Sequence, residues 1–414
     1  MELKVIATSK PIEGVGKQFE SSSLQGLGGR YANVCYMAGT MDEVLNQSED
    51  KALKRAENCS VNTHHSVFDH ISITASISSI PKALAMLLNS FKVYGTSEKS
   101  ARYCEMRGLN NEDQYFYLKW IEKLTPIIKQ IDPTLKEGAV KKLAMENARY
   151  FISIFSPTTE MIFTTNIKDW NYFYQMLLEY KIYIEKNNSN KQSDFGTTIK
   201  FYNLLLDPLN ELLELIFNNV IKPFGVELES KKVKFNKLPF VDLNHIYHNS
   251  EFTEEIGYNY IIKHDMSFAC LGHKERSRTL NHSFCFTEKE KFYIPNFIRT
   301  NIQLVQEWEE DMRKVQHLFP QGMIVTVIES GSVEDFFKYQ VTERICNRVF
   351  YETCFVVWDQ AVKIQNTIKE SSTISKNFQQ WVSQFFDKNG ELLPKCVIVG
   401  CSSPCGKRVK KRIL

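Results

Sequence analysis

A strand followed by a helix occurs once in each half of the chain, and this recurrence most strongly limits what the chain can fold into. Residues 161–166 read as a strand and lead into an aromatic helix at 169–185. Residues 323–328 have the same character and lead into a helical region at 332–363, and each half places an arginine-containing stretch upstream. We interpret this as an internal duplication. It predicts an α+β fold of two related domains, each a central sheet flanked by helices.

Length and composition agree with more than one domain. The chain has 414 residues, 43% of them hydrophobic, so it can bury a substantial core. A lysine-rich segment with a proline separates the halves and reads as a linker. We predict a first domain at 1–228, a linker at 229–243, a second domain at 244–395 and a cysteine-containing basic tail at 396–414.

Charge and hydropathy argue against two large classes of partner. The formal net charge is only +3, so the chain has no general affinity for nucleic acid. No apolar run approaches membrane-spanning length, and the first residues do not form a secretory signal. The ten cysteines lack the spacing of a disulfide framework, which favours a reducing compartment. We expect a cytoplasmic protein that binds neither nucleic acid nor membranes.

Other elements follow from periodicity and from breaker residues. Alternation predicts strands at 3–8 and 71–77, and charge placement predicts a helix at 41–57. A glycine-rich stretch at 25–30 reads as a loop, and the polar residues 187–198 read as a flexible loop.

The octapeptide 96–103 concentrates hydroxyls, a carboxylate and an arginine in less than two helical turns. Ser97 is the expected N-cap of a helix, which would place Glu98 and Ser100 in its first turn. An anion there would meet unpaired N–H groups, hydroxyls and the fork of Arg102. The pattern predicts a phosphate site, and an ordinary solvated helix start remains the alternative.

Residues 64–103 resemble the signature of the flavin-dependent thymidylate synthases, the ThyX family. That signature runs H-x-x-x-x-E-H, a strand, a helix, and then R-H-R-x-x-S-x-N-E-x-S-x-R-Y. The matching residues here are His64, Asp69 (in place of Glu), His70, Glu98, Ser100, Arg102 and Tyr103. Arg149 resembles the family arginine before the central strand, and Asn166 the residue after that strand.

The first half departs from the signature, and the second half supplies the missing residues. Ser90, Phe91 and Lys92 replace R-H-R, and Leu177 stands where a helix arginine belongs. In the second half, the segment 276–278 (Arg-Ser-Arg) looks like R-H-R, and Arg344 and Glu352 have the spacing of the family's L-R to A-Q-x-E helix. This half lacks a second S-x-R-Y. Because family enzymes assemble sites at subunit junctions, we interpret the complementary losses as composite sites built from a phosphate half-site and a flavin/base half-site.

The resemblance implies a chemistry and a set of residue roles. The implied reaction is reductive methylation of dUMP to dTMP with FAD hydride, NADPH and methylenetetrahydrofolate, in a homo-oligomer formed as a dimer of tandem chains. The implied roles are catalytic for Arg344 and Arg276, substrate-binding for Glu98, Ser100, Arg102, Tyr103 and Arg149, and cofactor-binding for His64, Asp69, Asn166, Arg276 and Arg278. The alternative is a non-catalytic nucleotide-binding scaffold or regulator descended from that family.

Cysteine and metal chemistry are the remaining possibilities, and neither is predicted. The nearest match to a Pro-Cys-His nucleophile is the segment 404–406, which lacks the histidine. His64 and His65 have no further ligand at suitable spacing, so no metal is predicted. A zinc site made from the tail cysteines with Cys346 or Cys354 stays open as the alternative.

Overall fold

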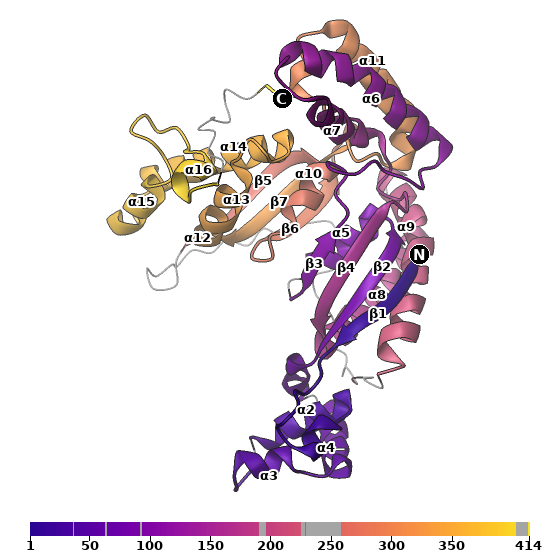
Figure 1. The fold of residues 1–414 in the computed structure, drawn as a ribbon. Coiled ribbons are helices and arrows are strands. Elements are labelled where there is room, and N and C mark those ends of the chain that lie inside the picture. Colours follow the sequence, from indigo (N-terminus) through magenta and orange to yellow (C-terminus); the bar gives the residue numbers. More distant parts are fainter. Residues whose placement is uncertain are drawn as a thin grey trace. The chain divides into compact units, whose positions relative to one another are not determined.

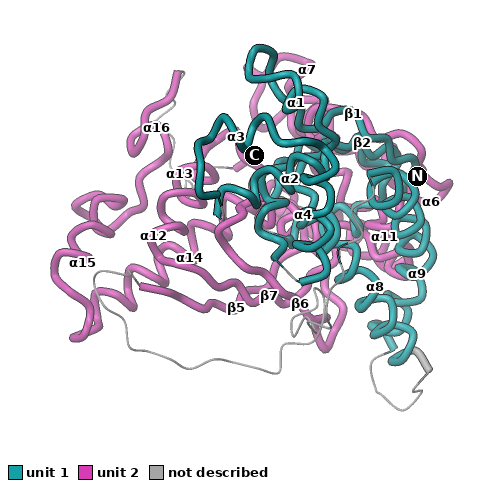
Figure 2. The backbone as a smooth tube through the Cα atoms, turned by 90° about the horizontal axis from the view of Figure 1, so that it is seen from below, with its two compact units in different colours: residues 1–99, 157–238 teal, residues 100–156, 239–414 magenta. Residues whose placement is uncertain are grey.

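The structure is a computed structural model that describes residues 1–35, 37–62, 64–91, 93–189, 196–224, 228, 258–402 and 413–414. It divides into two compact units, residues 1–99 with 157–238 and residues 100–156 with 239–414 (Figure 2). The predicted linker at 229–243 and the basic run at 407–412 lie outside the described residues, as does most of the predicted loop at 187–198. The α+β class is confirmed, because each unit contains one antiparallel sheet together with helices.

The first unit is built on a four-stranded sheet (Figure 1). Its strands are β1 (Glu2–Thr8), β2 (Ser72–Ile80), β3 (Gly95–Glu98) and β4 (Thr159–Asn166), in the order β1-β2-β4-β3. Alternate residues of β2, including Ile73, Ala75 and Ile77, are buried, as the predicted period of two requires. The helices that pack with this sheet are α5 (Lys82–Ser90), α8 (Ile167–Ser189) and α9 (Gly196–Ile216), the last continuing into the π-helical turn η3 (Phe217–Ile221).

A cluster of short helices precedes β2 in this unit. These are α1 (Lys17–Glu20), α2 (Leu24–Asn33), α3 (Met41–Leu45), α4 (Glu49–Val61) and the 3₁₀ helix η1 (His65–His70). The loop predicted at 25–30 is wrong, because these residues lie inside α2. A Cβ on Gly29 would lie 1.7 Å from the Ala52 carbonyl oxygen, so the glycine allows α2 to approach α4 closely. The single helix predicted at 41–57 is two helices, α3 and α4.

The second unit contains a three-stranded sheet and two groups of helices (Figure 1). Its strands are β5 (Asn259–Ser267), β6 (Asn281–Phe286) and β7 (Ile324–Ser332), in the order β5-β7-β6. The helices close to the sheet are α10 (Phe268–Lys274), α12 (Val333–Asp335), the π-helical η6 (Phe336–Val341), α13 (Thr342–Arg344) and α14 (Tyr351–Glu370). Beyond α14 lie α15 (Lys376–Ser383) and α16 (Lys395–Ile398).

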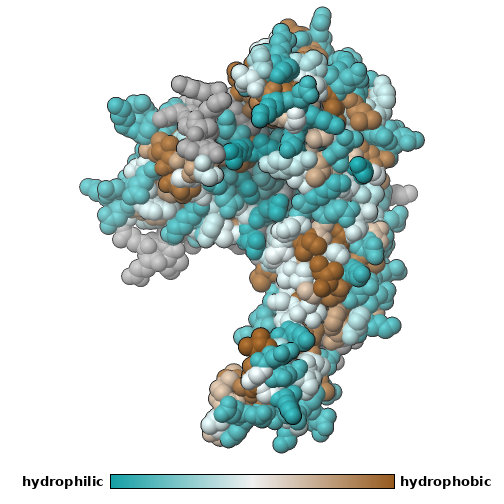
Figure 3. Space-filling view, viewed as in Figure 1, coloured by the Kyte–Doolittle hydropathy of each residue, from teal (hydrophilic) through white to brown (hydrophobic). Residues whose placement is uncertain are grey.

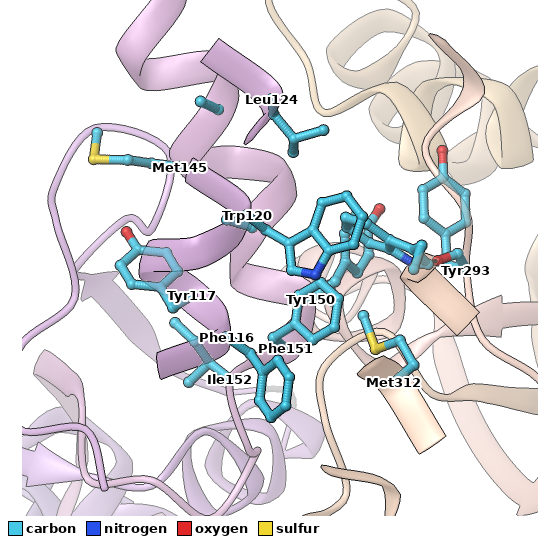
Figure 4. Packing of buried hydrophobic residues seen from close by; sticks show 14 of the residues in the cluster. Phe116, Tyr117, Trp120, Leu124, Met145, Tyr150, Phe151, Ile152, Tyr293 and Met312 are labelled. Carbon is cyan, nitrogen blue, oxygen red and sulfur yellow. Dashed lines mark hydrogen bonds between the residues drawn. The ribbon is translucent and has the colours of Figure 1, made fainter. Parts of the chain in front are cut away.

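The second group of helices in this unit surrounds an aromatic core (Figure 4). It comprises α6 (Asn111–Ile131), α7 (Glu137–Ala148), the 3₁₀ turn η2 (Arg149–Phe151) and α11 (Ile302–Val315), with short 3₁₀ turns η4 (Asn296–Ile298) and η5 (Gln316–Leu318). The ring of Trp308 lies 4.7 Å from Trp120 and 4.6 Å from Phe151, centroid to centroid. Residues 100–156 therefore pack with the second half of the chain, whereas the predicted boundary at 228 places them in the first domain. Elsewhere the predicted domain boundaries stay a prediction.

The two sheets share an order of strands. When β1 is left out, the strand order of the first sheet is β2-β4-β3, and that of the second sheet is β5-β7-β6. In each sheet the central strand, β4 or β7, is the last of the three in the sequence. The first residue of β2 pairs with Asn166 at the end of β4, and the first residue of β5 pairs with Ser332 at the end of β7. By this register Asn166 corresponds to Ser332. The alignment of 161–166 with 323–328 drawn from the sequence is therefore displaced by four residues.

No helix among the described residues is long and apolar enough to cross a membrane. On the face shown in Figure 3, hydrophilic residues predominate and hydrophobic ones form separate patches.

Candidate functional site

The octapeptide 96–103 is not a helix start. Residues 96–98 belong to β3, and residues 100–103 form a turn at the beginning of the second unit. The Glu98 carboxylate accepts hydrogen bonds from Lys82 Nζ at 2.8 Å and from Asn89 Nδ2 at 2.5 Å. Its side chain is only 5% exposed. Glu98 is thus held inside the first unit, while Ser100, Arg102 and Tyr103 belong to the second.

The three residues predicted to bind flavin in the first unit have different surroundings. His64 is exposed, and Asp69 forms an ion pair with Lys168 at 2.6 Å. Asn166 is buried and caps the start of α8, where its Oδ1 accepts from the Asp169 N–H at 2.7 Å. His65 is also buried, and its Nδ1 lies 2.8 Å from the Tyr172 hydroxyl. No group of three or more His, Cys, Asp or Glu side chains among the described residues could hold a metal ion.

The turn that carries Arg102 lies against α7 in the second unit. The Arg102 Nε is 3.0 Å from Glu146 Oε2, and the Glu146 side chain is 3% exposed against 20% for Arg102. The guanidinium also lies 5.6 Å from the ring centre of Tyr103, which is an exposed residue. The cation predicted to bind phosphate is therefore already paired with a carboxylate.

Arg149, at the start of η2, faces the beginning of α14. Its guanidinium lies 4.2 Å from the ring centre of Phe350, a cation–π distance. Its Nε is buried and has no hydrogen-bond partner among the described residues. A buried guanidinium N–H without an acceptor is costly, and a bound anion would supply the acceptor.

Glu352 is the buried carboxyl next to Arg149. Its Oε1 accepts from the Ser267 N–H at 2.8 Å, and its Oε2 accepts from the hydroxyls of Ser267 at 2.5 Å and Tyr150 at 2.9 Å. Burial raises the pKa of Glu352 above its usual range, although these hydrogen bonds and the charge of Arg149 oppose the shift. The spacing of Glu352 from Arg344 marks it in the sequence, whereas Tyr150 and Ser267 carry no sequence signal.

Arg344, at the end of α13, is the most deeply placed of the predicted catalytic residues. Its side chain is 14% exposed, and its Nη2 donates to the His273 carbonyl at 3.5 Å. Its Nε is buried without a hydrogen-bond partner among the described residues. Burial lowers the pKa of Arg344, the Glu343 carboxylate 3.6 Å from its Nη2 opposes this shift, and the charge of Arg276 lowers the pKa further.

The second unit therefore brings several predicted site residues together. Arg276 lies within electrostatic range of Arg344, and Arg276 and Arg278 are both exposed in the turn after α10. We call Arg149, at the start of η2 and beside Phe350, Arg276, after α10, and Arg344, at the end of α13, the arginine cluster. Such a cluster suits an anionic ligand.

The geometry is that of an α+β protein with an arginine-rich candidate anion site. Residues 26–186 match the family model Thy1, described as thymidylate synthase complementing protein. The match covers less than half of the chain. The predicted resemblance is confirmed over this segment, which is similar to that family.

Comparisons of whole chains find more distant likenesses. A flavin-dependent thymidylate synthase ThyX from Helicobacter pylori, complexed with FAD and dUMP, is 14% identical with a TM-score of 0.31, over 55% of this chain and 98% of that one. A UMP/dUMP methylase PolB from Streptomyces cacaoi, bound with 5-Br dUMP, is 14% identical with a TM-score of 0.26, over 41% of this chain and 75% of that one. No curated protein sequence matches the chain. Scores this low define no shared site.

Proposed function

We propose that the protein is a flavin-dependent thymidylate synthase-like enzyme that converts dUMP to dTMP. One observation carries the proposal: two guanidinium groups of the arginine cluster, on Arg149 and Arg344, have a buried Nε that finds no acceptor among the described residues. Cations arranged in this way suit an anionic ligand such as a nucleotide. The family match over residues 26–186 supports a nucleotide as that ligand.

The residues divide between binding and charge stabilisation in this proposal. Arg344 and Arg276 would stabilise the negative charge that develops on the pyrimidine carbonyls when C5 attacks the one-carbon unit. Arg149, Arg102 and Ser100 would neutralise phosphate, with Tyr103 and Glu98 completing the substrate contacts.

The donor set of the chain also fits FAD as the cofactor. The Nε atoms of Arg149 and Arg344, which have no partner within the part of the chain that the structure describes, are buried donors of the kind that a diphosphate accepts from. Arg276, Arg278, His64, Asp69 and Asn166 are the proposed contacts to FAD. Reduced flavin, when bound, would supply the hydride that completes the methyl group. NADPH and methylenetetrahydrofolate are the proposed co-substrates.

We also propose that the two units derive from a tandem duplication and complete each other's sites. The shared strand order supports the duplication. The second unit holds Arg276 and Arg344, for which the first has Ser90 and Leu177. Composite sites in a homo-oligomer, a dimer of tandem chains, would restore a full set of residues from such complementary halves.

A non-catalytic nucleotide-binding scaffold is the second candidate. It is favoured by the pairing of three predicted ligand contacts with side chains of the chain itself. Glu98 is held by Lys82 and Asn89, Arg102 by Glu146, and Asp69 by Lys168. Ligand binding at these positions would have to displace an existing ion pair.

The test uses the full chain and separates binding from turnover. Bound flavin would colour the purified protein yellow, and C5-tritiated dUMP would release tritium with FAD, NADPH and methylenetetrahydrofolate. Arg344→Gln should lower tritium release by roughly 10²- to 10³-fold, as loss of a charge-stabilising donor does. The matched control, Arg313→Gln on the exposed face of α11, should leave it unchanged.

The outcomes decide between the two candidates. A wild-type protein that binds FAD and dUMP but releases no tritium would support the scaffold. A wild-type protein that binds neither would end both proposals.

A further inference from the structure

A buried ion pair joins α10 to the central strand of the second unit. Lys274 Nζ lies 2.9 Å from Glu329 Oε2, and the two side chains are 0% and 1% exposed. His282 Nε2 is 2.8 Å from the same oxygen, and the Tyr260 hydroxyl donates to Oε1 at 2.7 Å. Lys274 Nζ also donates to Gln360 Oε1 at 2.7 Å. The network thus reaches all three strands of the sheet as well as α10 and α14.

The Glu329 side chain is the negatively charged member of this network. Burial alone would raise the pKa of Glu329, but Lys274 and His282 outweigh it and hold the pKa well below its usual range. Glu329 is therefore a carboxylate, and His282 Nε2 donates a hydrogen bond to it. A buried ion pair of this kind is often no more stabilising than apolar side chains of the same size. Its presence calls for a role other than stability.

The first unit shows that the sheet does not need these charges. Phe163 lies three residues before the end of β4, and Glu329 lies three residues before the end of β7, the central strands of the two sheets. Phe163 pairs with Thr96 on β3, and Glu329 pairs with His282 on β6. Leu88 is the seventh residue of α5, the helix that follows β2, and Lys274 is the seventh residue of α10, the helix that follows β5. Phe163 and Leu88 are fully buried apolar residues. At this place, the first unit has an apolar core and the second has an ion pair.

The network holds the segment that carries the arginines. Lys274 is the last residue of α10, and Arg276 follows in the next turn. The Lys274 carbonyl accepts from Gln340 Nε2 at 3.4 Å, and the His273 carbonyl accepts from Arg344 Nη2. Arg344 and Arg276 repel each other, since the charge of one lowers the pKa of the other. Their proximity therefore has to be imposed by the surrounding structure.

We propose that Lys274 is a positioning residue that, through Glu329, holds Arg276 and Arg344 side by side to receive an anionic group of the ligand. This rests on the proposed function, which places Arg276 and Arg344 at the bound ligand, and it adds that the pair also meets a phosphate or diphosphate of that ligand. The first unit agrees with it: where the ion pair is absent, the positions that correspond to the two arginines by the register of the sheets are Ser90 and Leu178.

The test removes the charges without leaving one of them unpaired. Lys274→Met alone would strand the Glu329 carboxylate, so the informative variant is Lys274→Met with Glu329→Gln. The matched control is Lys119→Met with Asp311→Asn, a second ion pair with a buried carboxylate, between α6 and α11 and distant from the arginines in sequence. The probes are FAD and inorganic pyrophosphate, titrated by calorimetry at two salt concentrations, with thermal unfolding measured in parallel.

We expect the Lys274/Glu329 double variant to keep a cooperative unfolding transition but to bind both probes roughly tenfold or more weakly, because the arginines are no longer preorganised. Its affinity should also depend less on salt. The control should bind as the wild type does. A folded double variant that binds both probes within about twofold of wild type, or one that loses no more affinity than the control, would overturn the positioning role.

The remaining outcomes separate this inference from the proposed function. If the wild type binds pyrophosphate but neither FAD nor dUMP, the proposed function fails, and the positioning role is judged on pyrophosphate alone. If the wild type does not bind pyrophosphate or FAD, the arginine pair receives no such anion and the positioning role is refuted.

Discussion

Replacing Arg102 by alanine should destabilise the region around α7, because it leaves the buried Glu146 carboxylate without its cation. Neither Glu146 oxygen accepts a hydrogen bond from the described residues, so the ion pair at 3.0 Å is its main compensation. Stranding one member of a fully buried pair costs about 3–5 kcal/mol. Since Arg102 is 20% exposed, water offsets part of this cost, and we expect about 2–3 kcal/mol.

The second half of the prediction is a rescue. In the Arg102→Ala background, Glu146→Gln removes the stranded charge and should recover about 1–2 kcal/mol, which is the coupling between the two positions. Glu146→Gln alone should have the smaller effect, since Arg102 can still reach solvent. Because a chain with two units need not unfold in one step, native-state hydrogen exchange of the α7 amides is the appropriate assay.

The same variants separate a structural role of Arg102 from a ligand contact. If Arg102 binds phosphate, the double variant should recover stability yet bind dUMP roughly ten- to a hundredfold more weakly than wild type. The reasoning fails if Arg102→Ala changes α7 exchange by less than about 0.5 kcal/mol, or if Glu146→Gln gives no rescue.

Two further predictions concern the second unit. Relative to wild type, Glu352→Gln should be more favourable to stability at pH 7 than at pH 4, because a folded-state pKa raised above the unfolded value makes the wild type lose stability as the pH rises between the two values; a pH-independent difference in hydrogen exchange of the α14 amides would contradict this. A fragment of residues 1–228 should leave the α6 and α7 amides unprotected in hydrogen exchange, because Trp120 and Phe151 lose the ring of Trp308, whereas full protection there would contradict the division into units.

Much of the fold could be predicted from local patterns. Strands with strict alternation, such as β2, and long helices, such as α8, were recognisable because their pattern is contained in one segment. The sequence did not predict helix α2, because glycine usually ends helices. Here Gly28 packs closely against Phe68 and Gly29 against Ala52, where a Cβ atom would not fit. That requirement comes from residues distant in sequence.

The octapeptide shows the same limit at the site. Its capping residues fit a helix start, yet residues 96–98 pair with β4, where Thr96 lies opposite Phe163. A four-residue strand is decided by its partner rather than by its own propensity. Arg344 and Glu352 could be found from their spacing, whereas the Lys274–Glu329 pair could not, because the two residues are brought together only by the fold.

The role of the Lys274–Glu329 ion pair can be judged by comparing the second unit with the first. Two sheets with one strand order place Phe163 and Leu88 in one unit where Glu329 and Lys274 stand in the other. If the ion pair served only stability, the apolar version in the first unit shows that it could be dispensed with. It occurs in the unit that has the arginines, and the unit that lacks them has an apolar core instead. A positioning role requires that the ion pair and the arginines occur in the same unit. A purely structural role does not explain why they do.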